Sequence, residues 1–509
     1  MIQHAKKFIR TVAAILAAGL LATAVMPAPT NAQLCEANCY SRSIPIPGAR
    51  PDLSPQTGVL RNLTDPTIIN ILPGQVVNRD AINKPPGQPN LTILGQDNGQ
   101  NGQNNQTNQQ TATRINGMPP PGETRFLPDR VLVFSRGPLS QALIDLITGL
   151  GFTLVEQQSL TVVGFYGYEF RINDVSTMSV RDAIRLIVNA TPASSVPLVQ
   201  PDYLFLTVQQ SQRPAPAAAN QTTQEGDPAQ YVVEKWKLAD VHRLVKGNNV
   251  IIAVIDSEID AGHPDLEGVV AQRFSAVGAP EQPHPHGTGM AGAIASHQKL
   301  IGIAPGARLL AVHAFSSKAA TAESTTFQIL KGIDWSVLQG ARIINMSFAG
   351  PRDPSMAQAL KAAYDRNVVL VAAAGNAGPK SPPLFPGADP NVIAVTATDV
   401  DDKLFPGANR GKYVAIAAPG VDILVPAPQD AYQLTTGTSV ASAEVSGVVA
   451  LMLQRNPNLR PADVRRILIS TARRLGTAAR DDNFGSGLVD PLKAIAAADP
   501  RVSSVAPRR

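Results

Sequence analysis

Four polar residues, each beside an apolar or small-residue run, have the side chains needed for acyl transfer. Asp256 follows the apolar run Val250–Ile255, His286 opens His-Gly-Thr-Gly-Met-Ala-Gly, Asn376 lies in Ala-Gly-Asn-Ala-Gly and Ser439 in Thr-Gly-Thr-Ser. A serine hydroxyl is a weak nucleophile that needs an adjacent base. An imidazole can take that proton and pass it to the leaving amine, while a carboxylate holds the imidazole in the required tautomer. An asparagine amide and the serine backbone N–H could bind the tetrahedral oxyanion.

The elements around these residues predict an α/β fold with a doubly wound, mostly parallel sheet. A continuous apolar run such as Val250–Ile255 is typical of a parallel strand covered on both faces. Apolar runs and helix-period segments alternate through residues 229–497, and the ligand site of such a sheet lies at the carboxyl ends of its strands. Further strands are expected at Leu309–Val312, Ile343–Met346, Val368–Ala374 and Val392–Thr396, and helices at Gly287–His297, Thr325–Gln339, Pro354–Arg366 and Ser439–Arg455.

A smaller α+β module is predicted before this domain, over residues 126–210. Its strand and helix patterns follow the order βαββαβ, which indicates a ferredoxin-like unit. The first strand is expected at Val131–Phe134, and the last extended stretches cover 196–200 and 203–208. The polar, Pro/Ala-rich residues 211–228 are predicted to form a linker.

The composition of the N-terminal residues predicts an export signal followed by a spacer. Lys6, Lys7 and Arg10 precede an apolar run and then small residues around Ala32, which is the layout of a secretory signal over residues 1–32. An uncleaved anchor is the alternative. We therefore expect a secreted protein, periplasmic or extracellular, with no transmembrane segment in its mature form. Residues 33–125 are Pro-, Asn- and Gln-rich, a composition that predicts a disordered spacer.

Charge and composition argue against two other classes of function. The net charge of +5 is small for 509 residues, and no basic stripe with interleaved aromatics is present, so nucleic-acid binding is not expected. The two cysteines and scattered histidines form no zinc pattern, so no metal or cofactor is expected. Structural calcium on Asp260 and Asp265 is left as an alternative.

Five blocks resemble the signature blocks of the subtilisin-like serine proteases (subtilases, peptidase S8 type). They are Ile-Asp-Ser at 255–257, His-Gly-Thr at 286–288, Ile-Asn-Met-Ser at 344–347, Ala-Gly-Asn at 374–376 and Gly-Thr-Ser at 437–439, in the order of that family. The resemblance covers about 229–497. It implies a hydrolase with Asp256 as orienter, His286 as general base, Ser439 as nucleophile and Asn376 as oxyanion donor. It also places substrate beside Ser347, Phe348, Ala349 and Leu384.

The 126–210 module resembles the propeptides of the same family. The resemblance implies a zymogen that cuts itself, with the module acting as an intramolecular inhibitor whose last strand lies in the active-site cleft. Protein and peptide substrates are the expected partners. A non-catalytic interaction module with the same fold is the alternative function.

The sequence departs from the family pattern at several positions. Glu258 stands where glycine is usual, which adds a carboxylate near the triad and would be strained at positive φ. Ala443 replaces a usual proline, and Glu444 follows it. His263, His284, His297 and His313 have no motif context, so structural or surface roles are expected for them.

Overall fold

The computed structural model describes residues 68–72, 75–78, 114–207, 211–214, 227–318, 321–476 and 478–503. The predicted signal segment 1–32, and most of the predicted spacer and linker, lie outside the described residues. Within the predicted spacer, strands β1 (Ile68–Leu72) and β2 (Gln75–Asn78) pair antiparallel. In the part of the chain that is described, no helix is long and apolar enough to cross a membrane.

Residues 114–207 form the N-terminal module, a four-stranded antiparallel sheet in the order β6-β3-β5-β4 with two helices. Its elements follow the expected order βαββαβ. Each helix begins after a serine, Ser140 or Ser179, whose hydroxyl accepts a backbone N–H of the first turn. The elements are β3 (Phe126–Ser135), α2 (Gln141–Gly149), β4 (Phe152–Leu160), β5 (Phe165–Ile172), α3 (Val180–Ala190) and β6 (Leu198–Thr207).

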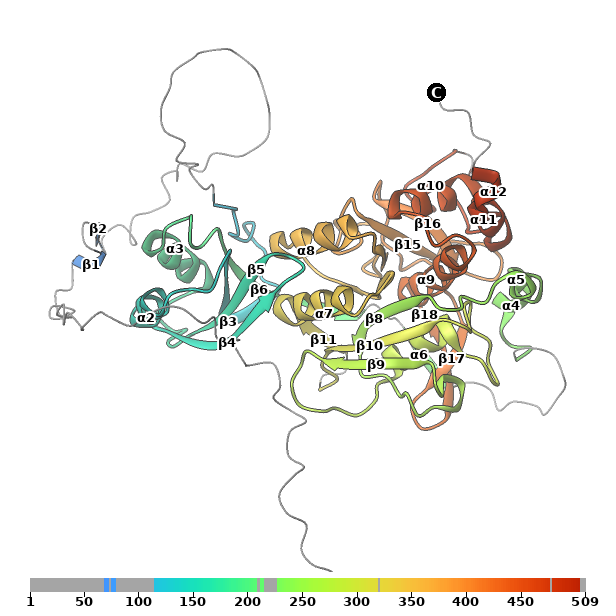
Figure 1. Cartoon of the computed structure of the whole chain (residues 1–509), viewed down its shortest axis with the longest axis horizontal. Helices are drawn as coiled ribbons and strands as arrows, with labels where there is room; N and C mark the ends of the chain where they lie inside the picture. The colour runs from blue at the N-terminus through green and yellow to red at the C-terminus, as the bar shows by residue number, and fades with distance from the viewer. Residues whose placement is uncertain are drawn as a thin grey trace, which may run out of the picture. The chain divides into compact units, whose positions relative to one another are not determined.

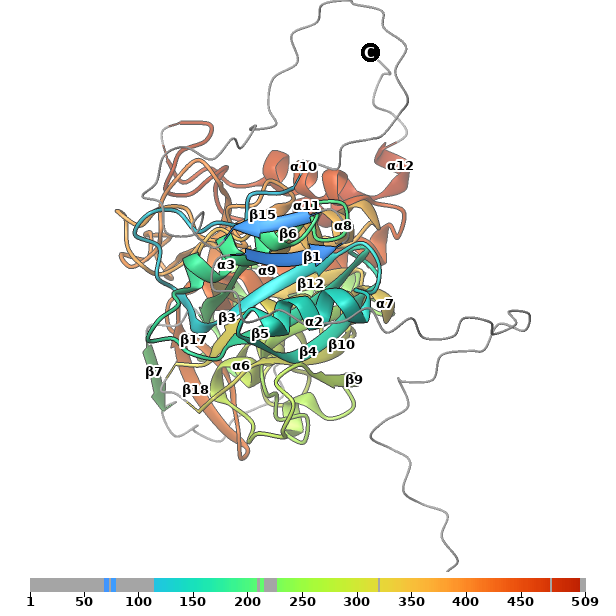
Figure 2. The same ribbon diagram turned by 90° about the vertical axis from the view of Figure 1, so that its left-hand side faces the viewer.

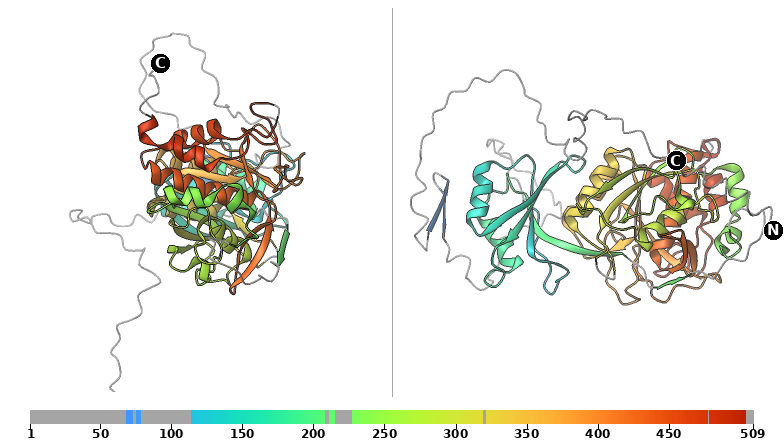
Figure 3. Two further views of the ribbon diagram at one scale, coloured as in Figure 1. Left: turned by 90° about the vertical axis from the view of Figure 1, so that its right-hand side faces the viewer. Right: turned by 90° about the horizontal axis from the view of Figure 1, so that it is seen from below.

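The two faces of this sheet bury different cores, because side chains alternate along a strand. Val131 and Val133 of β3 pack with α2 and α3 in one core, whereas Leu132 and Phe134 join the core that contains residues of the next domain. In Figure 1 and the right panel of Figure 3, the helices of the module lie on the outer face of its sheet. Figure 2 shows the same helices from the module's side.

The module begins at Arg114, earlier than the expected boundary at 126. The Arg114 guanidinium donates to the backbone oxygens of Thr191 (2.6 Å) and Val196 (2.9 Å), and Ile115 forms an isolated bridge with Leu198. These contacts satisfy carbonyl groups that the end of α3 and the start of β6 leave open. Residues just before position 126 therefore pack on the module.

Residues 227–503 form the C-terminal domain, whose seven-stranded sheet has the order β16-β15-β14-β12-β8-β10-β9 and is parallel throughout. This confirms the predicted doubly wound α/β class. The sheet strands are β8 (Ile251–Ser257), β9 (Val270–Ser275), β10 (Arg308–Phe315), β12 (Ile343–Met346), β14 (Val369–Ala373), β15 (Val392–Thr398) and β16 (Val414–Pro419). The helices are α4 (Tyr231–Lys235), α5 (Leu238–Leu244), η2 (Pro264–Leu266), α6 (Pro285–Ala295), α7 (Thr326–Leu338), α8 (Pro354–Asp365), α9 (Thr438–Arg455), α10 (Pro461–Thr471), α11 (Pro491–Ala498) and α12 (Pro500–Ser503).

Helices cover both faces of the parallel sheet, as the apolar strand runs predicted. On β8, Ile252 and Val254 pack in the core with α6 and α9, and Ala253 and Ile255 pack in the core with α7 and α8. In Figure 1, α7 and α8 lie between the sheet and the N-terminal module, while α9 to α12 lie on the other side. The core that contains α7 and α8 therefore also anchors the module.

A small antiparallel sheet completes the C-terminal domain and includes part of the predicted linker. It consists of β17 (Ile423–Ala427), β18 (Ala431–Thr436) and β7 (Ser211–Pro214), in the order β17-β18-β7. Residues 211–214 of the predicted linker pair with the edge of β18, which has backbone groups that a further strand can pair with. Two short strands, β11 (Glu323–Thr325) and β13 (Phe348–Ala349), pair with β6.

Candidate active site

Asp256 and His286 form a buried hydrogen-bonded pair at the carboxyl end of β8. Asp256 lies within the strand, which extends to Ser257, and its Oδ1 is 2.6 Å from His286 Nδ1. Both side chains are at most 1% exposed. Because Nδ1 donates to the carboxylate, Nε2 carries the lone pair that a general base needs. Nε2 is buried and finds no hydrogen-bond partner among the described residues.

Close packing between β8 and α6 places His286 against Asp256. Pro285 begins the helix, and its missing N–H is no loss at that position. A Cβ added to Gly287 would lie 2.3 Å from the Ser257 carbonyl oxygen, so only glycine allows the helix this near the strand. The Gly287 N–H donates to Ser257 Oγ at 3.0 Å. Gly287 therefore allows the close approach of helix and strand that places His286 beside Asp256.

Ser439 is the second residue of α9, and its contacts bring it to the same edge of the sheet. Its Oγ donates to the Ser347 carbonyl oxygen at 3.1 Å, and Ser347 Oγ donates to the Ser439 carbonyl oxygen at 3.0 Å. Ser347 directly follows β12, where Met346 is in register with Ile255, the residue before Asp256. The first turn of α9 therefore lies at the strand ends that carry Asp256.

Asn376 follows β14 and is oriented by the residue that precedes Ser439. Its Oδ1 accepts the Thr438 N–H (3.0 Å) and hydroxyl (2.8 Å), so Nδ2 is the donor end of the amide. Gly375 has φ +111°, and a Cβ there would lie 2.4 Å from Asn409 Nδ2. Glycine is thus required immediately before the asparagine. The arrangement keeps an amide donor next to the Ser439 backbone.

Strand β6 of the N-terminal module lies between two strands of the C-terminal domain at this edge. Thr207 is in register with Phe348, and Leu206 with both Ala349 and Glu323. The Phe205 ring packs edge-on against Phe348, with centroids 6.1 Å apart. Backbone pairing of β6 with β11 and β13 is the same kind of contact that holds an extended peptide in β-augmentation.

The residues predicted to contact substrate separate into two groups. Phe348 and Ala349 pair with β6, as just described, whereas the Ser347 hydroxyl is buried and engaged with Ser439. Leu384 is buried, and its neighbour Phe385 pairs with Gly350. A Cβ on Gly350 would lie 2.3 Å from the Phe205 ring. Gly350, which the sequence did not single out, therefore opens the space that Phe205 occupies.

The Glu258 carboxylate is paired with neighbouring side chains. It binds Arg273 and lies 3.1 Å from His313 Nδ1. Burial alone would raise the pKa of Glu258, but these hydrogen bonds outweigh it, so the pKa is lowered. Glu258 is also not among the non-glycine residues with positive φ, so the expected strain is absent.

The other histidines and the alternative calcium ligands mainly organise loops. His263 Nδ1 accepts the Asp265 N–H, and Asp265 Oδ1 accepts the N–H groups of Gln298 and Leu300. Across the described residues, no group of three or more His, Cys, Asp or Glu side chains is placed to hold a metal. His284 is the exception, because it contacts the elements that carry the Asp256–His286 pair. Sequence reasoning missed it because histidine is an unusual helix cap.

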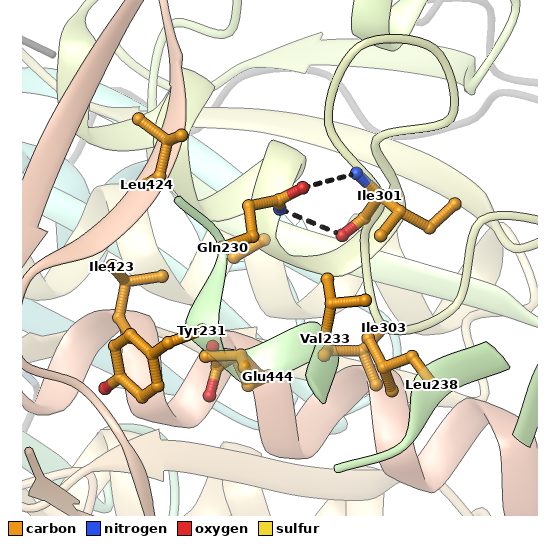
Figure 4. A pocket seen from close by; sticks show the side chains of 11 residues that line it. Gln230, Tyr231, Val233, Leu238, Ile301, Ile303, Ile423, Leu424 and Glu444 are labelled. Atoms are coloured by element: carbon orange, nitrogen blue, oxygen red, sulfur yellow. Dashed lines mark hydrogen bonds between the residues drawn. The ribbon is translucent and has the colours of Figure 1, made fainter. Parts of the chain in front are cut away.

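Further along α9 from Ser439, the buried Glu444 faces a small apolar cavity. The cavity measures about 20 Å³, room for about one water molecule. Figure 4 shows Glu444 beside Tyr231, with Ile303 and Ile423 in the cavity wall. Glu444 Oε2 has no hydrogen-bond partner within the described ranges, and burial raises the pKa of this carboxyl well above its usual range. The Lys235 ammonium counteracts this only in part, because it is engaged with Asp402 (2.7 Å).

Known proteins resemble this chain in sequence and in fold. The sequence model of the Subtilase family matches residues 247–487. Subtilisin DY of Bacillus licheniformis is 34% identical over 253 residues, 48% of this chain and 90% of that protein. Minor extracellular protease Epr of Bacillus subtilis (strain 168) is 32% identical over 302 residues, 57% of this chain and 46% of that protein. Fervidolysin from Fervidobacterium pennivorans, a keratinolytic enzyme related to subtilisin, has a crystal structure that superposes with a TM-score of 0.63 at 25% identity, over 76% of this chain and 64% of that one.

Fold, strand-end chemistry and relatives agree on one class, the serine-type endopeptidases, and this chain is one of them. It belongs to the subtilase family, since it spans nearly all of subtilisin DY at 34% identity. The sequence resemblance to the subtilisin-like proteases is thereby confirmed.

Proposed function

We propose that this chain is the precursor of a secreted endopeptidase that uses Asp256, His286 and Ser439 as its triad and is inhibited by its own N-terminal module. The observation that carries the proposal is the pairing of β6 with β11 and β13, beside the 2.6 Å Asp256–His286 hydrogen bond. A strand held at that edge has the place of a substrate backbone. The predicted signal at 1–32 and the extracellular relative Epr support export.

The proposed reaction proceeds through an acyl-enzyme. Ser439 Oγ attacks the scissile carbonyl while its proton passes to His286 Nε2, and Asp256 stabilises the imidazolium. The Asn376 amide and the Ser439 N–H bind the oxyanion. His286 then gives its proton to the leaving amine, the C–N bond breaks, and water hydrolyses the ester by the same steps in reverse.

The same chemistry would cut the chain itself. Thr207 lies opposite Phe348, one residue beyond Ser347, whose carbonyl oxygen accepts from Ser439. A bond in the residues that follow Thr207 is therefore the proposed first cleavage site. The freed module would remain as an inhibitor because its strand is already paired.

A fluorophosphonate probe tests the triad directly. Processed wild-type protein should be labelled, and Ser439→Ala should not. Ser470→Ala, at an exposed serine on α10, is the matched control. Absence of labelling in the wild type would favour the alternative, a non-catalytic interaction module.

The substrate residue before the cut is expected to be uncharged and apolar. Neither 347–349 nor 373–376 contains Asp or Glu, and Leu384 is buried, so a Lys or Arg side chain would be buried unpaired. Such burial costs several kcal/mol, so two peptides that differ only in Leu or Lys at this position should differ at least about 100-fold in kcat/KM. A library profile dominated by Lys or Arg would contradict this.

A further inference from the structure

His284 caps the helix that carries His286. It is the N-cap of α6, and its Nδ1 accepts the His286 backbone N–H at 3.2 Å. Its own N–H donates to the Glu258 carbonyl oxygen (2.8 Å), and its carbonyl oxygen accepts the Thr288 N–H (3.2 Å). The first turn of α6 is thus fixed to the end of the β8 segment through one residue.

The His284 ring also reaches the carboxylate of the pair through one hydroxyl. Ser257 Oγ lies 3.2 Å from His284 Nδ1 and 3.1 Å from Asp256 Oδ1, and it accepts the Gly287 N–H at 3.0 Å. The hydroxyl proton therefore has two acceptors, the imidazole and the carboxylate. His284 and Ser257 together bind the N–H groups of His286 and Gly287, which have no partner within the helix.

These contacts require a neutral ring at His284. A protonated Nδ1 could not accept the His286 N–H, and it would add positive charge at the positive end of the α6 dipole. Burial and neighbouring His286 lower the pKa of His284, while Asp256 and Glu281 act in the opposite direction. Of the other charges nearby, the Glu258 carboxylate is bound by Arg273 and His313.

We propose that His284 is a positioning residue of the active site, which as a neutral hydrogen-bond acceptor fixes the backbone of His286 and, through Ser257, the carboxylate of Asp256. The proposal rests on the triad proposed above. His284 acts through its neighbours and is assigned no contact with the reacting atoms.

Replacement of His284 by alanine and by asparagine tests this role. His284→Ala removes the acceptor, so kcat should fall about 10- to 100-fold, the range for a small displacement of a catalytic group, with little change in KM. His284→Asn supplies an amide oxygen, a preferred N-cap acceptor, and should restore most of kcat. His297→Ala, an exposed histidine just past the other end of α6, is the matched control and should keep wild-type kcat.

The acid side of the pH profile separates this role from a purely structural one. The wild type should lose activity through protonation of both the general base and His284. In His284→Asn, the second of these groups is replaced by an amide that does not titrate. The limiting slope of log kcat/KM against pH should therefore be about one lower in His284→Asn.

Three outcomes would overturn the inference: wild-type kcat in His284→Ala, no recovery in His284→Asn, or equal acid slopes in wild type and His284→Asn. If the alanine variant is unstable, kcat and the acid slope of His284→Asn still test the inference. If instead wild type and Ser439→Ala hydrolyse peptide equally, the proposed triad has failed and not the role of His284.

Discussion

Replacing Ser439 with alanine is expected to lower peptide turnover by about 10⁶-fold and to leave the precursor uncut. The magnitude is that of subtilisin, whose serine variant loses this much, and is carried over to this chain by its family membership. The physical reason is that the nucleophile is absent, so no acyl-enzyme forms. Rates of peptide hydrolysis and gel analysis of the expressed protein measure the two effects.

The cleavage pattern distinguishes self-processing from processing by another protease. The wild type should give a C-terminal fragment of at most 302 residues, by the arithmetic 509 − 207. Ser439→Ala should accumulate as a longer chain cut only at its signal, and the control Ser470→Ala should mature like the wild type. Maturation of Ser439→Ala at the wild-type rate in a protease-deficient host would show that the chain does not cut itself.

Replacing Glu444 with glutamine is expected to remove a large loss of stability toward alkaline pH. The pKa of this carboxyl is raised by burial in the folded domain and is about 4.3 when the chain is unfolded. The folded state therefore holds a proton that the unfolded state releases, so the contribution of Glu444 to stability is greatest below about pH 4.3 and is lost as the pH rises toward the folded pKa. Each pH unit in that window lowers the free energy of unfolding by about 1.4 kcal/mol, a factor of about ten.

Urea unfolding at a series of pH values measures this effect. Both tryptophans, Trp236 and Trp335, lie in the C-terminal domain, so their fluorescence reports on that domain. All variants should carry Ser439→Ala to prevent self-digestion. Stability should depend less steeply on pH in Glu444→Gln than in its parent, and the exposed Glu267→Gln should behave like the parent. Parallel curves for the parent and Glu444→Gln would mean that Glu444 is charged in the folded domain.

The strand ends were predictable because buried parallel strands have continuous apolar sequences. The run Val250–Ile255 correctly indicated that Asp256 lies at the carboxyl end of a strand. Strands β9 and β18 lack such runs, because β9 lies at the edge of its sheet and both strands have exposed residues. They were missed for this reason.

The sequence could not reveal contacts that depend on residues far apart in the chain. Arg114 is held by carbonyl groups near the end of α3, and composition gives no sign of such partners. Glu444 follows a family motif, yet only the packed domain shows that no neighbouring donor reaches its Oε2. His284 resembled a surface histidine until the cap geometry of α6 was known.

Strand β6 pairs with strands of both the N-terminal module and the C-terminal domain, so the proposed inhibition would be thermodynamically linked to the folding of the module. Its pairing with β3 keeps the strand extended where it meets β11 and β13, and this preorganisation would lower the entropy lost on binding. When only a fraction of the freed module is folded, its apparent affinity is the intrinsic affinity multiplied by that fraction. Ile184 is a buried residue of α3 in the core of the module, away from the substrate edge. Ile184→Ala should destabilise the module and therefore shorten the lag before activity appears. The length of inhibition would then be set by the stability of a core that never touches substrate.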